Sequence, residues 1–202
     1  MKLCRREGIN LFGTEKYDLS KNHRKPMGKG GFGKMSDFSL QLRKKQAAKR
    51  MYGVTEKQFS AYYKKALKLN GILGENMLRL IELRFDNVVF KSNFARTIMQ
   101  ARQFVGHAHF LVNGEKVNIA SYSLKVGDVI ELREKLKESP IYKSLVEEFK
   151  EFMKTNKSGS ITNAKWLEVN PDKLTIKLIR VPEKDDFDQT IDVQKIIEFY
   201  SK

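Results

Sequence analysis

The positive charge of this 202-residue chain is concentrated at one end, which limits the folds and partners it can have. Residues 1–76 carry 18 Lys and Arg side chains against 6 Asp and Glu, whereas residues 77–140 carry 10 against 7. Residues 141–202 are balanced, with 11 of each. The excess positive charges of residues 1–76 would repel one another in a compact fold. We therefore expect this part of the chain to bind a polyanion such as RNA. The alternative is a soluble protein that is basic without such a partner.

The rest of the composition excludes several protein classes. Hydrophobic residues make up 41% of the chain, enough to bury real cores. No run of about 18 apolar residues exists, which argues against a membrane span. The first residues lack the apolar stretch of a secretory signal, and the single cysteine, Cys4, excludes an internal disulfide. We therefore expect a cytosolic protein without a membrane partner.

The first 35 residues predict an extended basic segment rather than a helix. Residues 8–35 are rich in Gly, Lys and Asn, and residues 26–33 contain one Pro and four Gly. Such residues oppose regular helix, so this segment should become ordered only against a partner. The alternative is a floppy tail.

Two helices should follow this segment. Ser36 and Asp37 offer an N-cap for a helix over residues 38–52, and residues 55–58 fit a capping box that begins the next. The apolar face of the second helix carries two tyrosines. These rings could stack on bases, but aromatic side chains at helical spacing more often belong to a core. The two are Tyr62 and Tyr63.

The middle of the chain predicts two further helices. The first should cover residues 75–84, with residues 86–90 as its end running into a loop. The second should begin after a cap at Thr97 and run to Val105, where Gly106 ends it.

Strands are expected in the second half of the chain, which makes the fold class α+β. Asn113-Gly114 between residues 110–112 and 116–117 predicts a hairpin with a primed turn. Residues 129–133 alternate as a strand. The remaining segments predict a helix over 141–153, strands at 166–169 and 173–179, and an apolar end, 191–202, that docks.

Nothing in the sequence predicts catalysis. The three histidines, His23, His107 and His109, lack the spacing of a shared metal site, and no nucleophile-elbow, phosphate-loop or zinc-protease motif is present. Residues 28–33 match a dinucleotide fingerprint only loosely, without a preceding apolar strand. We therefore expect neither an enzyme nor a bound cofactor or metal.

Several blocks of sequence resemble the bacterial-type small-subunit ribosomal protein four family, in the same order along nearly the whole chain. The blocks are Leu3–Gly8 (LCRREG), Ser36–Gln46 (SDFSLQLRKKQ), Arg50–Val54 (RMYGV), Glu56–Phe59 (EKQF), Gly74–Asn76 (GEN), Arg84–Val89 (RFDNVV), Ala101–Val105 (ARQFV), His107–Ile119 (HAHFLVNGEKVNI) and Glu198–Lys202 (EFYSK).

The resemblance implies a domain organisation. Residues 1–74 would form an N-terminal ribosomal-protein domain, with the extended segment at 1–35 and helices at 36–70. Residues 75–137 would form a small helix–helix–hairpin RNA-binding module. Residues 138–202 would supply a C-terminal helix, strands returning to the first domain, and a terminal segment that docks on the other domains.

The resemblance also implies a role. Such proteins are structural constituents of the small ribosomal subunit in the cytoplasm. They bind the 5′ domain of small-subunit rRNA early in assembly, contact small-subunit protein five and other ribosomal proteins near the messenger entry, and support translational accuracy. Some repress their own messenger, which makes messenger RNA a further candidate partner.

The sequence departs from the family pattern at two points. Some relatives bind zinc with four N-terminal cysteines, but Cys4 is alone here, and one thiolate cannot build a structural zinc site. The family often has Arg three residues before the Ala-Arg-Gln block, where this chain has Ile98. Arg96 is the candidate replacement.

Binding should combine phosphate neutralisation with recognition of RNA shape. The candidates in the first domain are Arg5, Arg6, Arg43, Lys44, Lys45, Lys49 and Arg50. In the module the matching motifs imply Arg84, Arg102, Gln103, His107, Asn113 and Lys116, besides Arg96. Each basic side chain could instead be merely solvated. Arg84 and Arg102 have another alternative, which is to pair with Asp86 or Glu82 and hold the fold.

Two rival functions use the same module. An accessory RNA-modification factor would need a catalytic domain, for which residues 141–202 are too few and the first 76 too basic and Gly-rich. An RNA-binding translational regulator would not co-sediment stoichiometrically with small subunits.

Overall fold

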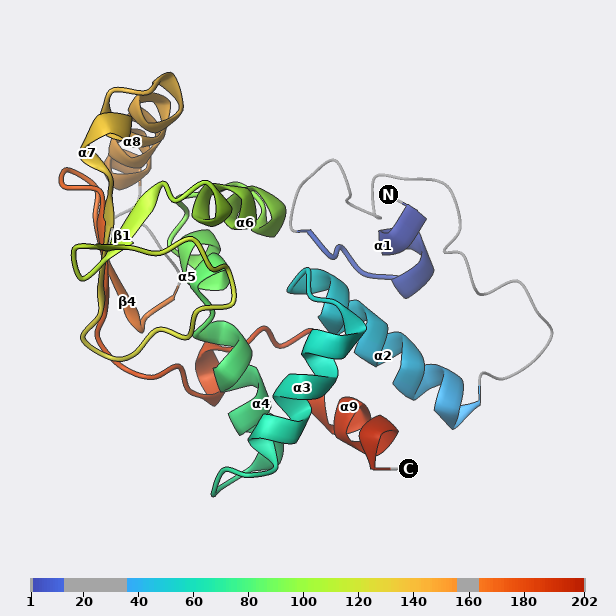
Figure 1. Cartoon of the computed structure of the whole chain (residues 1–202). Coiled ribbons are helices and arrows are strands. Elements are labelled where there is room, and N and C mark those ends of the chain that lie inside the picture. The colour runs from blue at the N-terminus through green and yellow to red at the C-terminus, as the bar shows by residue number, and fades with distance from the viewer. Residues whose placement is uncertain (1, 13–35, 156–163, 202) are drawn as a thin grey trace. The chain divides into compact units, whose positions relative to one another are not determined.

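A computed structural model describes residues 2–12, 36–155 and 164–201 (Figure 1). Most of the predicted extended segment at 1–35 therefore lies outside the described residues. The chain divides into two compact units, Met1–Met77 together with Asp188–Lys202, and Leu78–Phe187. In this division residues 138–187 belong to the second unit and residues 188–202 to the first.

The described part of the first unit is helical, and side-chain caps stabilise the N-termini of two of its helices. In α2 (Asp37–Met51), the backbone N–H of Ser39 donates to Ser36 Oγ at 3.3 Å, as the N-cap prediction required. The predicted capping box at α3 (Glu56–Ala66) is also confirmed, because Thr55 and Gln58 bond reciprocally. The unit also contains α1 (Lys2–Glu7), the start of α4 (Leu73–Glu82) and α9 (Val193–Tyr200).

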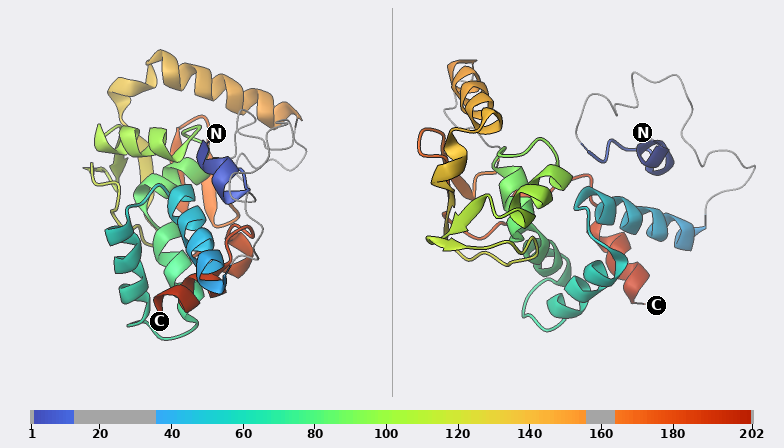
Figure 2. Two further views of the ribbon diagram at one scale, coloured as in Figure 1. Left: turned by 90° about the vertical axis from the view of Figure 1, so that its right-hand side faces the viewer. Right: turned by 45° about the horizontal axis from the view of Figure 1, so that its top comes forward.

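The C-terminal helix α9 packs against α2 within this unit, as the views in Figures 1 and 2 agree. Ile196 is buried, and the Phe199 ring lies 5.5 Å from that of Phe38. Tyr200 stacks on Tyr63 with ring centroids 4.8 Å apart, so this tyrosine belongs to the packing of α3 against α9. The prediction that the apolar chain end docks is confirmed.

Gly74 lets the start of α4 approach α9 closely. A Cβ built on Gly74 would stand 2.6 Å from Cγ1 of Val193 and 3.2 Å from Cδ1 of Ile197. Val193 is β-branched and short, so it cannot turn its methyl group away freely. The contact therefore requires a residue without a side chain.

We expect Gly74→Ala to destabilise the protein by about 1–3 kcal/mol through overpacking. The same change in an open helix would stabilise by about 0.5–1 kcal/mol, so the sign is diagnostic. Urea unfolding of the purified protein measures it. Adding Val193→Ala should restore part of the loss, and independent, additive effects of the two changes would contradict the close approach.

A five-stranded antiparallel sheet forms the second unit, in the order β2-β1-β3-β5-β4. The strands are β1 (Phe110–Val112), β2 (Glu115–Lys116), β3 (Val129–Leu132), β4 (Leu167–Asn170) and β5 (Thr175–Leu178). The hairpin turn has positive φ at both Asn113 (51°) and Gly114 (82°), which confirms the predicted primed turn. The inner face of the sheet carries Phe110, Ile130, Ile176 and Leu178, all in the core.

Helices complete this unit. They are α5 (Phe85–Lys91), α6 (Ile98–Gly106), α7 (Glu134–Lys137), α8 (Pro140–Thr155) and a short 3-10 turn at Lys184–Asp186. The cap at Thr97 is confirmed, since its hydroxyl accepts from the N–H of Gln100 at 3.2 Å.

The structure confirms the α+β class but corrects three details. Residues 2–7, predicted as part of the extended segment, form helix α1, because burial of Cys4 with Leu11 and Ala47 stabilises a helix there. Residues 85–91 form a separate helix, not the frayed end of the preceding one. The N–H groups of Phe85 and Asp86 donate to the carbonyls of Tyr122 and Ala120, so tertiary contacts override the weak helical preference of this segment. The C-terminal strands also do not return to the first domain. Strand β5 pairs with β3 in the second unit, and residues 188–202, which include α9, belong to the first unit.

Candidate nucleic-acid interface

A buried carboxylate organises two arginines of the first unit. Helix α1 packs on α2 through Cys4, Leu11 and Ala47. This packing places the Glu7 side chain, which has 0% exposure, against two arginines of α2. Glu7 forms ion pairs with Arg43 at 3.4 Å and with Arg50. The two arginines lie seven residues apart on one helix face and remain about one-fifth exposed, so each is fixed in place while part of it reaches the surface.

A second ion-pair network holds the lysines of α2. Lys45 and Lys49 bond to opposite oxygens of Glu56, at 2.8 and 3.1 Å, and the Tyr200 hydroxyl donates to Glu56 at 2.9 Å. Burial by itself would raise the pKa of Glu56, but these hydrogen bonds hold the pKa below its ordinary value. Lys45 is buried and lies 4.0 Å from the centre of the Phe199 ring. Both lysines therefore help to join α2, α3 and α9.

Three other predicted basic residues of this unit are not held by a described carboxylate and can therefore contact a ligand more readily than Arg43, Lys45, Lys49 and Arg50. Arg6 is exposed, and Arg5 and Lys44 are half-buried. Within the part of the chain that the structure describes, no ion pair joins any of the three to an acidic side chain. Among the predicted residues of this unit, they are the basic side chains that no described carboxylate holds.

In the second unit a buried aspartate joins two predicted arginines. Asp86 is fully buried and accepts a bidentate pair from Arg84, at 2.9 and 2.7 Å. Arg102 of α6 adds two further hydrogen bonds to the same carboxylate, at 2.9 and 2.6 Å. Arg84 is 2% exposed, whereas Arg102 keeps 30% of its side chain at the surface. The alternative that these arginines pair with Asp86 and hold the fold is thus observed, and Arg102 can in addition meet a ligand.

We expect Asp86→Ala to destabilise the protein by about 3–5 kcal/mol, because it leaves the buried Arg84 charge without a partner. Chemical denaturation followed by circular dichroism measures the loss. The double variant Asp86→Ala with Arg84→Met should recover much of it, since the fully buried charge is then gone and the partly exposed Arg102 can be solvated. Equal stability of the two variants would contradict this account.

The exposed end of α6 carries two further candidates of the module. Gln103 and His107, four residues apart on one helix face, are both exposed. Arg133, which follows β3, donates to the Ala108 carbonyl at 3.1 Å and is half-buried. Arg133 was not among the residues predicted from the sequence, although it is a basic residue at the end of a predicted strand. At the end of α6 these side chains join the partly exposed Arg102, so the surface there offers two guanidinium groups beside polar side chains.

His109 lies beneath this surface and stays neutral. Its ring stacks on Phe104 with centroids 5.0 Å apart, and its Nδ1 lies 2.8 Å from the Tyr142 hydroxyl. Burial lowers the pKa of His109, and the nearby His107 and Arg133 lower it further. The imidazole is therefore neutral in the fold at neutral pH, whereas the unfolded chain protonates it near its ordinary value of 6.5.

A lowered histidine pKa favours the folded state above the unfolded value, so we expect stability to fall as pH drops below about 6.5. Unfolding free energies measured across pH 5 to 8 test the sign. His109→Gln, which cannot protonate, should flatten this part of the profile. If the variant kept the same slope, another group would be responsible.

The remaining predicted residues occupy the hairpin and the loop before α6. Asn113 bonds with Asp128 at 2.9 Å and accepts from the N–H of Val129, so it ties the turn to β3. Lys116 is exposed on the edge strand β2. Ile98 is buried in the core, and Arg96 is 74% exposed and pairs with Glu148.

The outer face of the sheet differs in charge from the α6 surface. Exposed Glu131, Glu168 and Lys177 alternate across β3, β4 and β5, and Glu168 stands directly opposite Lys177. Such mixed charges offer no net attraction to phosphate. The α6 side is thus the better candidate for RNA within this unit.

The described ranges contain neither a cluster of metal ligands nor a membrane-spanning helix. There, no three His, Cys, Asp or Glu side chains lie close enough together to hold a metal ion. None of the helices described is both long and apolar enough to cross a membrane.

Comparison with known proteins matches both parts of the chain to families. The family described as "Ribosomal protein S4/S9 N-terminal domain" matches residues 1–82, and the one described as "S4 domain" matches residues 83–130. These matches define the class as ribosomal proteins that carry the RNA-binding S4 domain.

Curated relatives identify the family within that class. Small ribosomal subunit protein uS4 of Heliobacterium modesticaldum is 43% identical, uS4A of Clostridium acetobutylicum 44%, and uS4 of Thermodesulfovibrio yellowstonii 42%. Each alignment covers 100% of this chain and 96% of the relative. The chain belongs to the small ribosomal subunit protein uS4 family, which confirms the resemblance found in the sequence.

Proposed function

We propose that this chain is a structural constituent of the small ribosomal subunit in the cytoplasm. In this role it binds the 5′ domain of small-subunit rRNA and nucleates assembly around it. It also contacts small-subunit protein five and other ribosomal proteins near the messenger entry and thereby supports translational accuracy. The names and full-length coverage of the curated relatives support the placement in the subunit.

One structural observation carries the RNA-binding part of the proposal. In each unit a carboxylate with 0% exposure holds arginines whose side chains remain partly at the surface. A guanidinium presents a planar fork of donors, and the carboxylate that fixes it reduces the entropy lost on binding phosphate. The arginines arranged in this way are Arg43, Arg50 and Arg102.

The other basic and polar residues fall into two groups, those with accessible surface and those whose polar groups are bonded within the fold. Arg5, Arg6, Lys44, Gln103, His107, Lys116 and Arg133 would make direct contacts with RNA, because each retains accessible surface. Arg84, Lys45, Lys49 and Asn113 would act through the fold, since internal partners occupy their polar groups.

We expect Arg102→Ala to weaken binding to the 5′-domain RNA and to reduce the salt slope of log K by about 0.7–0.9, the value of one phosphate contact. Arg102→Lys should keep the salt slope but bind less tightly, because a lysine lacks the fork. Filter binding across a salt series measures both quantities.

Lys177→Ala is the matched control, because it removes one positive charge from the mixed outer face of the same unit. Its salt slope should match that of the unmodified protein. If folded Arg102→Ala also kept the unmodified slope, Arg102 would not be a phosphate contact. Chemical footprinting on small-subunit RNA tests the wider proposal, and absence of protection in the 5′ domain would overturn it.

A further inference from the structure

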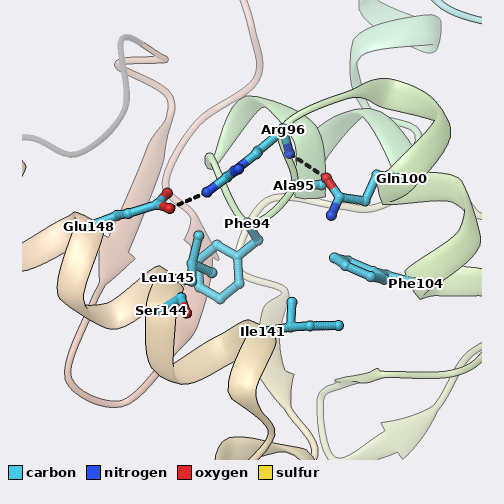
Figure 3. A pocket seen from close by; sticks show the side chains of 9 residues that line it. All are labelled: Phe94, Ala95, Arg96, Gln100, Phe104, Ile141, Ser144, Leu145 and Glu148. Atoms are coloured by element: carbon cyan, nitrogen blue, oxygen red, sulfur yellow. Dashed lines mark hydrogen bonds and ion pairs between the residues drawn. The ribbon is translucent and has the colours of Figure 1, made fainter.

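A small hollow lies in the second unit between α8 and the segment that begins α6 (Figure 3). Its volume is about 270 Å³. Phe94, Ala95, Phe104 and Leu145 form an apolar floor, and each is itself buried. Ile141 of α8 forms one lip and is 53% exposed, so apolar surface remains uncovered at the mouth.

Polar groups surround this floor. Arg96 extends across the mouth to an ion pair with Glu148 of α8, as the dashed line in Figure 3 shows. The backbone N–H of Arg96 donates to Gln100 Oε1 at 2.8 Å, which fixes the loop that supports it. The side chains of Arg96 and Glu148 are 74% and 47% exposed, so this ion pair is weak and an incoming charge can replace either partner.

The pocket side of α8 is acidic in an otherwise strongly basic chain. At about 100° per residue, Glu148 and Glu151 lie within about 40° of the lining residue Ser144, whereas Lys143 and Lys150 lie about 100° or more away, on the side opposite the pocket. Carboxylates at this edge repel RNA phosphates and attract cationic side chains.

The hollow is small and open, and its apolar floor can bury an aliphatic side chain of a partner. An aliphatic anchor buried in such a pocket, ringed by polar contacts, is the usual centre of a protein–protein contact.

We propose that this hollow receives one aliphatic side chain from a cationic segment of a neighbouring protein in the small subunit, and that a Lys or Arg of that segment takes the place of Arg96 at Glu148. The neighbour is inferred from the proposed function, but the binding chemistry rests on the hollow alone. The hollow is thus a protein-binding site, separate from the RNA-facing residues Gln103 and His107.

A labelled peptide tests the chemistry on the purified full chain. The probe is a short synthetic peptide with one central Leu flanked by Lys and Arg, followed by fluorescence anisotropy. Ser144→Phe, which fills the mouth from an exposed position, and Glu148→Lys should each weaken binding about tenfold. Replacing the central Leu of the peptide by Ser should have a similar effect.

The matched control is Glu168→Lys, which makes the same charge change at an exposed position on β4. It should leave peptide binding unchanged, because it lies outside the hollow. Equal loss in Glu168→Lys and Glu148→Lys would overturn the proposal, as would a Ser peptide that binds as well as the Leu peptide. A labelled single-stranded RNA oligonucleotide that binds the Glu168→Lys variant but not the Ser144→Phe variant would identify the hollow as an RNA site instead.

A crosslinking experiment tests the occupant in assembled subunits. A photoreactive benzoylphenylalanine replaces Ile141 at the exposed lip, and mass spectrometry identifies the crosslinked segment. We expect a protein segment that contains both basic and aliphatic residues. A crosslink to RNA, to an acidic segment or to nothing in subunits that contain the chain would overturn the proposal. If the chain failed to enter subunits, the proposed function would fail, and the peptide measurements would still decide on the hollow.

Discussion

The pairing of buried carboxylates with arginines is the interaction on which the rest of this structure depends. Asp86 joins α5 to α6 by accepting four hydrogen bonds from Arg84 and Arg102, and Glu7 joins α1 to α2 through Arg43 and Arg50. Burying a carboxylate is costly unless opposite charges and hydrogen bonds compensate it. Each carboxylate therefore requires its arginines, and each arginine set is fixed by a group that solvent cannot reach.

This arrangement explains how a chain with a net charge of +15 can remain compact. Much of the positive charge on α2 is offset internally, since Lys45 and Lys49 share Glu56 while Arg43 and Arg50 share Glu7. The excess that remains is carried by exposed or half-exposed groups such as Arg6 and Lys44. Helix α2 thus carries both basic residues that pair with internal carboxylates and a neighbouring residue, Lys44, that remains available to a polyanion.

Local sequence signals predicted much of the fold because they act over a few residues. The cap at Ser36, the box at Thr55–Gln58 and the Asn113-Gly114 turn satisfy nearby backbone groups, and all three are present. Helix α5 was missed because its start depends on the distant carbonyls of Ala120 and Tyr122. The pairing of β5 with β3 was missed for the same reason, since no local sequence pattern specifies which distant strand is the partner.

For the candidate site, residue type identified the basic residues from the sequence. Only tertiary packing distinguishes Arg84, whose side chain is buried, from Arg102, whose side chain is 30% exposed. The function was predicted from the sequence blocks that resemble the ribosomal protein family, because the basic composition alone does not distinguish one RNA-binding protein from another.

The first unit is assembled from the two ends of the polypeptide, with the whole second unit between them. During synthesis, α2 and α3 emerge long before α9, so the surface that α9 covers must wait for more than a hundred further residues to be translated. The second unit is contiguous and has all of its own strands once β5 has left the exit tunnel. The usual order of vectorial folding, in which the N-terminal part matures first, is therefore reversed in this chain. Its most basic unit acquires its final form only after the second unit and α9 have been translated.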